Sequence, residues 1–169
     1  LLALGAYEKR KNISLLFRVM ERLLSGGAAA PKLVLAGSEN LAATRYPAEV
    51  RKRGIEKSVI FLPYVSVAEL KGLYTHASAF LMPSRREGFG LPLLEAMYCG
   101  TPVVASDIPC HREVSGDAAL LVDPDDENGW LESVSKALND PGLRERLRRR
   151  GPERSGEFTW DVSAERTLD

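Results

Sequence analysis

The sequence predicts a single α/β domain in which a doubly wound parallel sheet is buried between helices. Short apolar runs bounded by turn residues alternate with segments of helical periodicity, a pattern typical of parallel sheets covered on both faces. No internal repeat, low-complexity tract or long linker divides the chain. Its 169 residues can bury roughly two-thirds of the surface of the unfolded chain. We therefore expect one domain over residues 1–169.

The elements follow from local signals along the chain. Strands are expected at residues 1–5, 32–37, 58–63, 78–84, 101–106 and 118–123. Asn12 can cap a helix whose apolar residues recur at spacings of three and four up to Leu24, before Gly26. Ser66 and Glu69 form a capping box that opens a later helix. Helices are expected within residues 13–24, 46–54, 66–74, 92–99, 109–114, 126–139, 141–150 and 158–168.

Charge and cysteine content narrow the class of protein. Lys plus Arg and Asp plus Glu each number 23, so no overall charge attracts nucleic acid or an acidic membrane, and an anion site must be local. Cys99 and Cys110 lie in unrelated settings, which suits a reducing compartment better than a disulfide framework. No run is long enough to span a membrane, and no signal peptide is visible. Because the chain starts without Met inside an apolar run, we expect a piece of a longer protein.

One strand-to-helix junction carries most of the candidate site. Ligands of doubly wound sheets bind beyond the carboxyl ends of the strands, where the strand order reverses. The junction SRREGFGLPLLEAM, residues 84–97, has Glu87 and Glu95 with seven residues between them. Gly88 and Gly90 let a ligand approach the backbone, and the helix that follows directs its free amide groups to the same place. The junction therefore predicts an anion site.

The junction after the first expected strand supplies a cationic counterpart. Arg10 and Lys11 lie there and would face the glycine loop if the two strands are neighbours. Neither GxGxxG nor GxxxxGK[ST] occurs at these junctions, which argues against a dinucleotide fingerprint and a P-loop. Diphosphate is the expected anion.

The run PSRREGFGLPLLEAMYCGTPVVASDIPCHREVSGDAALLVDP resembles the donor-binding signature of retaining glycosyltransferase family 4, the "glycosyl transferases group 1". Supporting matches include GAYEKRKN, LVLAGS, the segment VIFLPYVSVAELKGLYTHASAFLMPS and the closing FTW. The resemblance implies the C-terminal, nucleotide-sugar-binding half of a GT-B fold, a Rossmann-like unit with strand order 3-2-1-4-5-6. It also implies that the acceptor-binding N-terminal half is missing from this chain.

The resemblance assigns a role to each candidate residue. Glu95 matches the glutamate that accepts hydrogen bonds from the ribose, Glu87 the glutamate that contacts the donor sugar, and Lys11 the lysine that neutralises the diphosphate. Val65 aligns with a position that contacts the base. The residues whose backbone amides would line the sugar and the diphosphate are Gly88, Phe89, Gly90 and Leu91.

One departure from the family pattern concerns the second diphosphate cation. Many members have Gly-Arg where this chain has Gly5-Ala6, which leaves Arg10 as the candidate substitute. Members with a sequence resembling Arg10-Lys11-Asn12 often lack that arginine, and they include mannosyl transferases. GDP-mannose is therefore one candidate donor, although the sequence does not decide between UDP and GDP.

Several features have ordinary explanations. The Asp123-Pro124-Asp125 segment has the form of a metal-binding DxD, but it follows the last expected strand, and Asp125 or Asp126 can cap the next helix, so a turn is favoured. The arginine-rich segment 143–154 suits solvated cations near a helix end better than a membrane patch. His76 and His111 show no metal or triad pattern, and structural or surface roles are favoured for both.

The resemblance implies transfer of a sugar from a nucleotide diphosphate sugar to an acceptor with retention of anomeric configuration. Lys11 and the amides of the glycine loop would stabilise the departing diphosphate, so we expect no metal and no cofactor. The implied location is cytoplasmic, with membrane association of the full-length protein through its missing half. Two alternatives remain: a sugar phosphorylase or nucleotide-sugar epimerase on the same fold, and a non-catalytic nucleotide-sugar-binding domain. We expect this chain alone to bind donor and transfer nothing.

Overall fold

The computed structural model describes residues 1–5, 8–26, 31–37 and 44–158. Its sheet has six strands in the order β3-β2-β1-β4-β5-β6, with every adjacent pair parallel. The strands are β1 Leu2–Gly5, β2 Leu33–Gly37, β3 Val59–Leu62, β4 Phe80–Met82, β5 Val103–Ser106 and β6 Leu120–Val122. The doubly wound α/β prediction and its strand order are confirmed.

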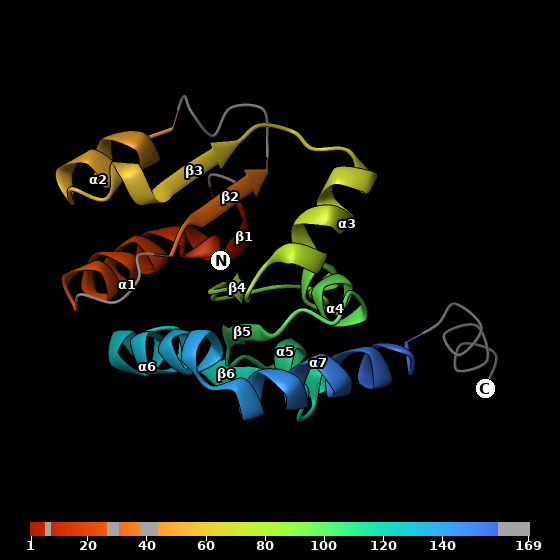
Figure 1. Cartoon of the computed structure of the whole chain (residues 1–169). Coiled ribbons are helices and arrows are strands. Elements are labelled where there is room, and N and C mark those ends of the chain that lie inside the picture. The colour runs from red at the N-terminus through yellow and green to blue at the C-terminus, as the bar shows by residue number, and fades with distance from the viewer. Residues whose placement is uncertain (6–7, 27–30, 38–43, 159–169) are drawn as a thin grey trace.

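The helices lie on both faces of this sheet (Figure 1). They are α1 Ile13–Ser25, α2 Tyr46–Lys52, α3 Val67–His76, α4 Leu91–Tyr98, α5 Pro109–Ser115, α6 Glu127–Asn139 and α7 Pro141–Ser155, with 3-10 helices at Lys9–Lys11 and Glu56–Ser58. In Figure 1, α1, α2 and α6 gather on one side, whereas α3 and α4 stand on the other. The expected helix at 158–168 lies almost entirely outside the described residues.

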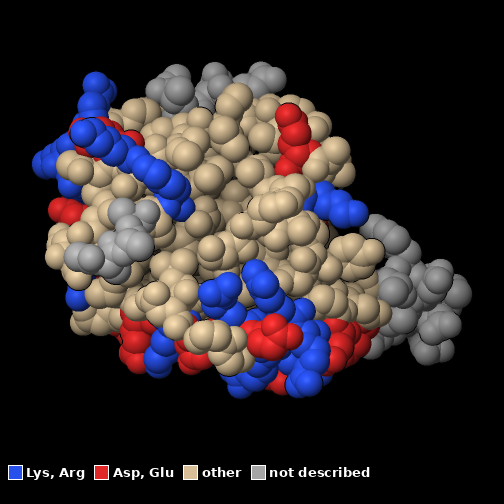
Figure 2. Space-filling model, viewed as in Figure 1, with Lys and Arg blue, Asp and Glu red and all other residues tan. Residues whose placement is uncertain are grey.

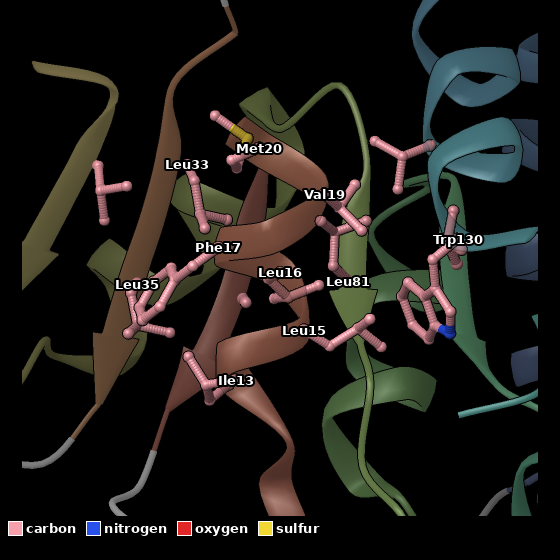
Figure 3. Packing of buried hydrophobic residues seen from close by; sticks show 14 of the residues in the cluster. Ile13, Leu15, Leu16, Phe17, Val19, Met20, Leu33, Leu35, Leu81 and Trp130 are labelled. Carbon is pink, nitrogen blue, oxygen red and sulfur yellow. The ribbon is translucent and has the colours of Figure 1, made fainter. Parts of the chain in front are cut away.

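Buried side chains fill the space between the sheet and each helical layer. On the α1 side, Phe17 packs beside the β2 side chains Leu33 and Leu35, and Trp130 of α6 belongs to the same cluster (Figure 3). A second cluster on the other side includes Leu93 and Met97 of α4 and Val103 of β5. Both faces of the sheet are therefore covered, and its carboxyl edge is the place where loops meet.

The N-caps predicted from the sequence are present in the structure, except that of Asn12. Ser66 and Glu69 form the expected capping box, and the Asp126 carboxylate accepts from the Gly129 amide at the start of α6. Asn12 occupies the N-cap position of α1, but its side chain makes no capping hydrogen bond. Its backbone is left-handed, with φ 52°, instead of the extended conformation that a capping side chain needs. The side-chain Nδ2 of Asn12 donates instead to the Pro124 carbonyl at 3.1 Å.

Helix α7 is longer than the sequence predicts. The proline at 152 favours an end near residue 150, yet α7 continues to Ser155. Leu147, Gly151 and Ser155, spaced by four, form its buried stripe. A Cβ on Gly151 would lie 2.9 Å from the Met97 carbonyl oxygen, so α7 packs closely on α4. This contact stabilises the extra turn.

Two arginines of α7, Arg150 and Arg154, are paired with acidic side chains. Positive and negative groups lie side by side along the lower edge of the molecule, in the region of α7 (Figure 2). Arg150 donates to Asp117 at 2.8 Å and to Glu153 at 2.6 Å. The ion pairs were not predicted, but they are compatible with the interpretation of this segment as solvated cations near a helix end. Within the described ranges, no helix has the length and apolar content needed to cross a membrane.

His111 of α5 is buried beneath the start of α4. Its Nδ1 donates to the Ser106 carbonyl at 2.9 Å, and a Cβ on Gly90 would lie 3.3 Å from its Cδ2. Burial lowers the pKa of His111 below its ordinary value, and the Ser106 hydrogen bond and the charge of Glu87 oppose that shift only in part. The structural role expected for His111 thus has a defined place, under the glycine that begins α4.

Gly151→Ala should destabilise the protein by about 1–3 kcal/mol, because the new methyl group meets the backbone of Met97. The matched control is Gly72→Ala in α3, where a Cβ has no neighbour within 4 Å. This control should stabilise by about 0.5–1 kcal/mol, since alanine loses less conformational entropy in a helix. Urea unfolding measures both free energies. Equal stabilisation by the two substitutions would contradict the close α4–α7 contact.

The stability of the protein should fall as pH drops below about 6.5, partly because of His111. The unfolded imidazole takes up a proton in this range, whereas burial keeps the folded imidazole neutral. His111→Gln should reduce the slope of unfolding free energy against pH between about pH 7 and the lower folded pKa. His76→Gln is the control, since His76 is exposed. An unchanged slope in His111→Gln would reject this assignment.

Candidate functional site

The candidate site lies where the strand order reverses, between β1 and β4. These strands are neighbours in the sheet, as the sequence argument required. The chain leaving β1 enters the 3-10 helix Lys9–Lys11, and the chain leaving β4 enters the loop that leads to α4. The Arg85 amide donates to the Arg10 carbonyl at 2.7 Å, which joins the two loops through their backbones.

Glu87 receives two cations from the neighbouring loop. Lys11 Nζ lies 2.8 Å from Glu87 Oε1, and Arg10 Nη1 lies 2.8 Å from Glu87 Oε2. Arg10 also contacts Glu8 through its Nε. The side chains of Glu87 and Lys11 are only 10% and 17% exposed, so this ion pair is better protected from solvent than an ordinary surface pair.

The pKa of Glu87 lies below its ordinary value. Burial by itself favours the neutral acid, but hydrogen bonds from Lys11 and Ser84 and the charges of Lys11 and Arg10 outweigh that effect. Glu87 is therefore a carboxylate at neutral pH. Two cations therefore lie beside one partly buried carboxylate, and Glu8 is a second acidic partner of Arg10.

The glycine loop continues directly from Glu87 into the start of α4. Gly90 is the N-cap, with φ 93°, a backbone conformation that residues other than glycine rarely adopt. Gly88 is exposed, with nothing within 4 Å of the position of a Cβ, and Phe89 and Leu91 are 44% and 59% exposed. No acidic residue occupies the first turn of α4. Its amide groups therefore present positive partial charge to an incoming anion.

Glu95 lies further along α4 and contacts a different partner. Tyr74 of α3 donates its hydroxyl to Glu95 Oε2 at 3.1 Å. Burial, followed by the negative charge of Glu95, raises the pKa of Tyr74, which keeps this hydroxyl protonated. The Tyr74 ring is held by an edge contact to Phe80, with centroids 5.3 Å apart. Glu95 thus has a fixed, hydrogen-bonded orientation although its side chain is exposed.

The structure places Glu95 and Val65 in separate hollows. Glu95 and Tyr74 line a cavity of about 380 Å³ between α3 and α4. Val65 lines another of about 790 Å³, formed by the α3 side of the sheet and the segment that follows β3. The larger cavity contains none of Arg10, Lys11 and Glu87. The structure therefore brings Lys11, Arg10 and Glu87 together, whereas Glu95 and Val65 line two different cavities.

The Asp123-Pro124-Asp125 segment is a turn, as expected. The Asp125 amide donates to the Asp123 carboxylate at 2.8 Å, and the Asp125 carboxylate accepts a bidentate interaction from Arg85. Across the described ranges, no group of three or more His, Cys, Asp or Glu residues is arranged to hold a metal ion. Cys99 and Cys110 are free thiols.

Sequence reasoning missed Tyr74, which orients Glu95, and the floor that His111 provides under Gly90. Tyr74 sits in a helix whose apolar pattern predicts only burial. No metal-ligand or catalytic-triad pattern surrounds His111 in the sequence. Neither residue carries a local signal, because each acts on a residue of a different element.

The comparisons with known proteins agree with this architecture. The family model described as "Glycosyl transferases group 1" matches residues 1–154. The chain is 34% identical over 168 residues to O-antigen chain mannosyltransferase B of Escherichia coli, covering 99% of this chain and 44% of that protein. It is 33% identical over 171 residues to D-inositol 3-phosphate glycosyltransferase of Corynebacterium jeikeium, covering 95% and 40%.

A solved structure shows the same fold. Sucrose-phosphate synthase from Thermosynechococcus elongatus superimposes with a TM-score of 0.85 at 28% identity, over 98% of this chain and 43% of that protein. The chain thus spans less than half the length of these relatives. The match over residues 1–154, together with the shared sheet, places the chain in the family of glycosyl transferases group 1.

Proposed function

We propose that this chain binds the nucleotide diphosphate sugar donor of a retaining glycosyltransferase of family 4. The observation that carries the proposal is the Lys11–Glu87–Arg10 cluster beside the start of α4. Cations and helix-end amides converge there at the switch point of a doubly wound sheet, which is where such sheets bind ligands. The relatives are glycosyltransferases, which does not favour a phosphorylase, an epimerase or a non-catalytic domain.

In the proposed complex, the distal phosphate of the donor lies against Lys11 and the amides of Gly88, Phe89, Gly90 and Leu91. Arg10 contributes a second positive charge, and Glu87 turns toward the sugar. As the bond between the anomeric carbon and the diphosphate oxygen breaks, negative charge collects on the departing phosphate. Lys11 and the preoriented amides stabilise that charge more strongly than they stabilise the intact donor, which lowers the barrier.

The nucleoside end is proposed to lie toward α3. The ribose hydroxyls donate to Glu95, which Tyr74 holds in place, and the base approaches Val65. Neither contact distinguishes UDP from GDP. The resemblance to O-antigen chain mannosyltransferase B makes mannose a proposed sugar.

We further propose that the acceptor binds to a separate N-terminal domain of the full-length protein. A single sheet offers one wall of a two-domain cleft, whereas transfer requires the acceptor to be held against the anomeric carbon and water to be excluded. The chain alone is therefore proposed to bind donor without transferring sugar. A cytoplasmic location, with any membrane contact made by the missing part, belongs to the same proposal.

Binding of nucleotides tests the proposal, with Glu95→Gln as the decisive variant. A thermal-shift panel of UDP, GDP, ADP and dTDP with their sugars should identify one base, because ligand at 100 times its dissociation constant stabilises by about 2.7 kcal/mol. Loss of a charge-assisted hydrogen bond costs roughly 1.5–3 kcal/mol, so Glu95→Gln should weaken the monophosphate and diphosphate of that base alike, by about tenfold or more.

The control for Glu95→Gln is Glu145→Gln, an exposed substitution on α7 that should leave calorimetric affinity unchanged. Wild-type affinity in folded Glu95→Gln would reject the ribose contact. A wild-type chain that is stabilised by none of the nucleotides would reject the donor-binding function itself.

Lys11→Met should weaken nucleoside diphosphate binding by about tenfold or more and leave monophosphate binding nearly unchanged, since the proposed partner of Lys11 is the distal phosphate. Methionine keeps the apolar stem and removes the charge. Lys9→Met, an exposed change on the same 3-10 helix, is the matched control. Calorimetry with the nucleoside diphosphate and the monophosphate measures the two losses of affinity. Equal losses for the two ligands would place Lys11 elsewhere than at the distal phosphate.

A further inference from the structure

Gly88 and Phe89, which precede the N-cap Gly90, are exposed and have little to hold them in place within their own loop. Up to Glu87, the loop is anchored by the Arg85–Arg10 backbone hydrogen bond and the Lys11–Glu87 ion pair. Gly88 has open space around it, and glycines lose more backbone freedom on ordering than other residues. Phe89, between the two glycines, carries the only side chain of the segment.

The Phe89 ring contacts Phe158, which follows α7. The two ring centroids lie 5.9 Å apart with the planes at 75°, an edge-to-face geometry. Phe158 is fixed to the end of α7 by its amide, which donates to the Ser155 carbonyl at 3.1 Å. The end of α7 therefore reaches the loop that we assign to the distal phosphate.

Phe158 is itself held on its other side. The Arg154 guanidinium carbon lies 4.9 Å from the centroid of the Phe158 ring, within the range of a cation–π contact. Arg154 is anchored in turn by donating to the Val114 carbonyl at 3.0 Å and to the Glu113 carbonyl, at the end of α5. The close packing of Gly151 on Met97 fixes α7 against α4. The Phe158 side chain is thus held between Phe89 and Arg154.

We propose that Phe158 is a positioning residue for the glycine loop. Through Phe89, it holds the amide groups of Gly88–Leu91 in the arrangement that receives the distal phosphate. This inference rests on the proposed function, and it adds to it a residue that lies outside the motif containing Glu87 and Glu95. Preordering the loop reduces the entropy lost when the phosphate binds, so the effect is expected in diphosphate affinity.

Phe158→Ala in the whole 169-residue chain tests the proposal with two measurements. In the ligand-free protein, hydrogen exchange at the amides of residues 89–91 should become faster. By calorimetry, the dissociation constant for the nucleoside diphosphate chosen by the panel should rise about three- to tenfold, the factor that one aromatic pair provides. Affinity for the corresponding monophosphate should stay at the wild-type value.

Three variants separate positioning from general destabilisation. Phe158→Tyr keeps the ring and should restore wild-type exchange and affinity. Glu145→Ala removes an exposed side chain of α7 that lies outside the proposed site, and should change neither measurement. Phe89→Ala combined with Phe158→Ala should bind diphosphate no more weakly than Phe89→Ala alone, because the two rings act as one contact.

Unchanged amide exchange in Phe158→Ala, or equal weakening of monophosphate and diphosphate binding, would overturn the positioning role. If the wild-type chain binds no nucleoside phosphate, the proposed function fails. The exchange measurement in ligand-free protein still decides whether Phe158 orders the loop.

Discussion

The ion pair between Glu87 and Lys11, shared with Arg10, is the interaction on which the candidate site depends. A carboxylate that is nearly buried is stable only with cations and hydrogen-bond donors around it. Here the cations come from the loop after β1 and the carboxylate from the loop after β4, so the pair ties together two segments that meet only at the switch point of the sheet. In the proposed function, the same groups that hold the loops together supply positive charge for the diphosphate.

The start of α4 is supported from below and from the side. His111 packs under Gly90, α7 packs closely on α4 through Gly151, and Phe158 contacts Phe89. These supports belong to α5, to α7 and to Phe158 beyond the end of α7, and all of them contact α4 or the loop before it. An anion site made of backbone amides is only as well ordered as the elements behind it, which explains why so much of the fold converges on one short helix.

Local patterns account for the elements and for most of the candidate residues. Periodicity predicted the strands and α1, and the Ser66–Glu69 pattern predicted the start of α3. The same reasoning failed at Asn12, where a left-handed backbone redirects the side chain, and at the end of α7, where packing on α4 outweighs the preference of Pro152 to end a helix. In both cases, the residue contacts a segment far away in the sequence, which a local pattern does not include.

The sequence by itself determined the class of fold, the six strands, the glycine loop between two glutamates and the presence of Arg10 and Lys11 after the first strand. These features depend on spacing and residue type within short segments. Only the tertiary structure decided that Glu87 pairs with Lys11, that Tyr74 orients Glu95 and that Phe158 contacts Phe89. Such pairs join residues of different elements, and their contact depends on strand order and helix packing, which no local pattern specifies.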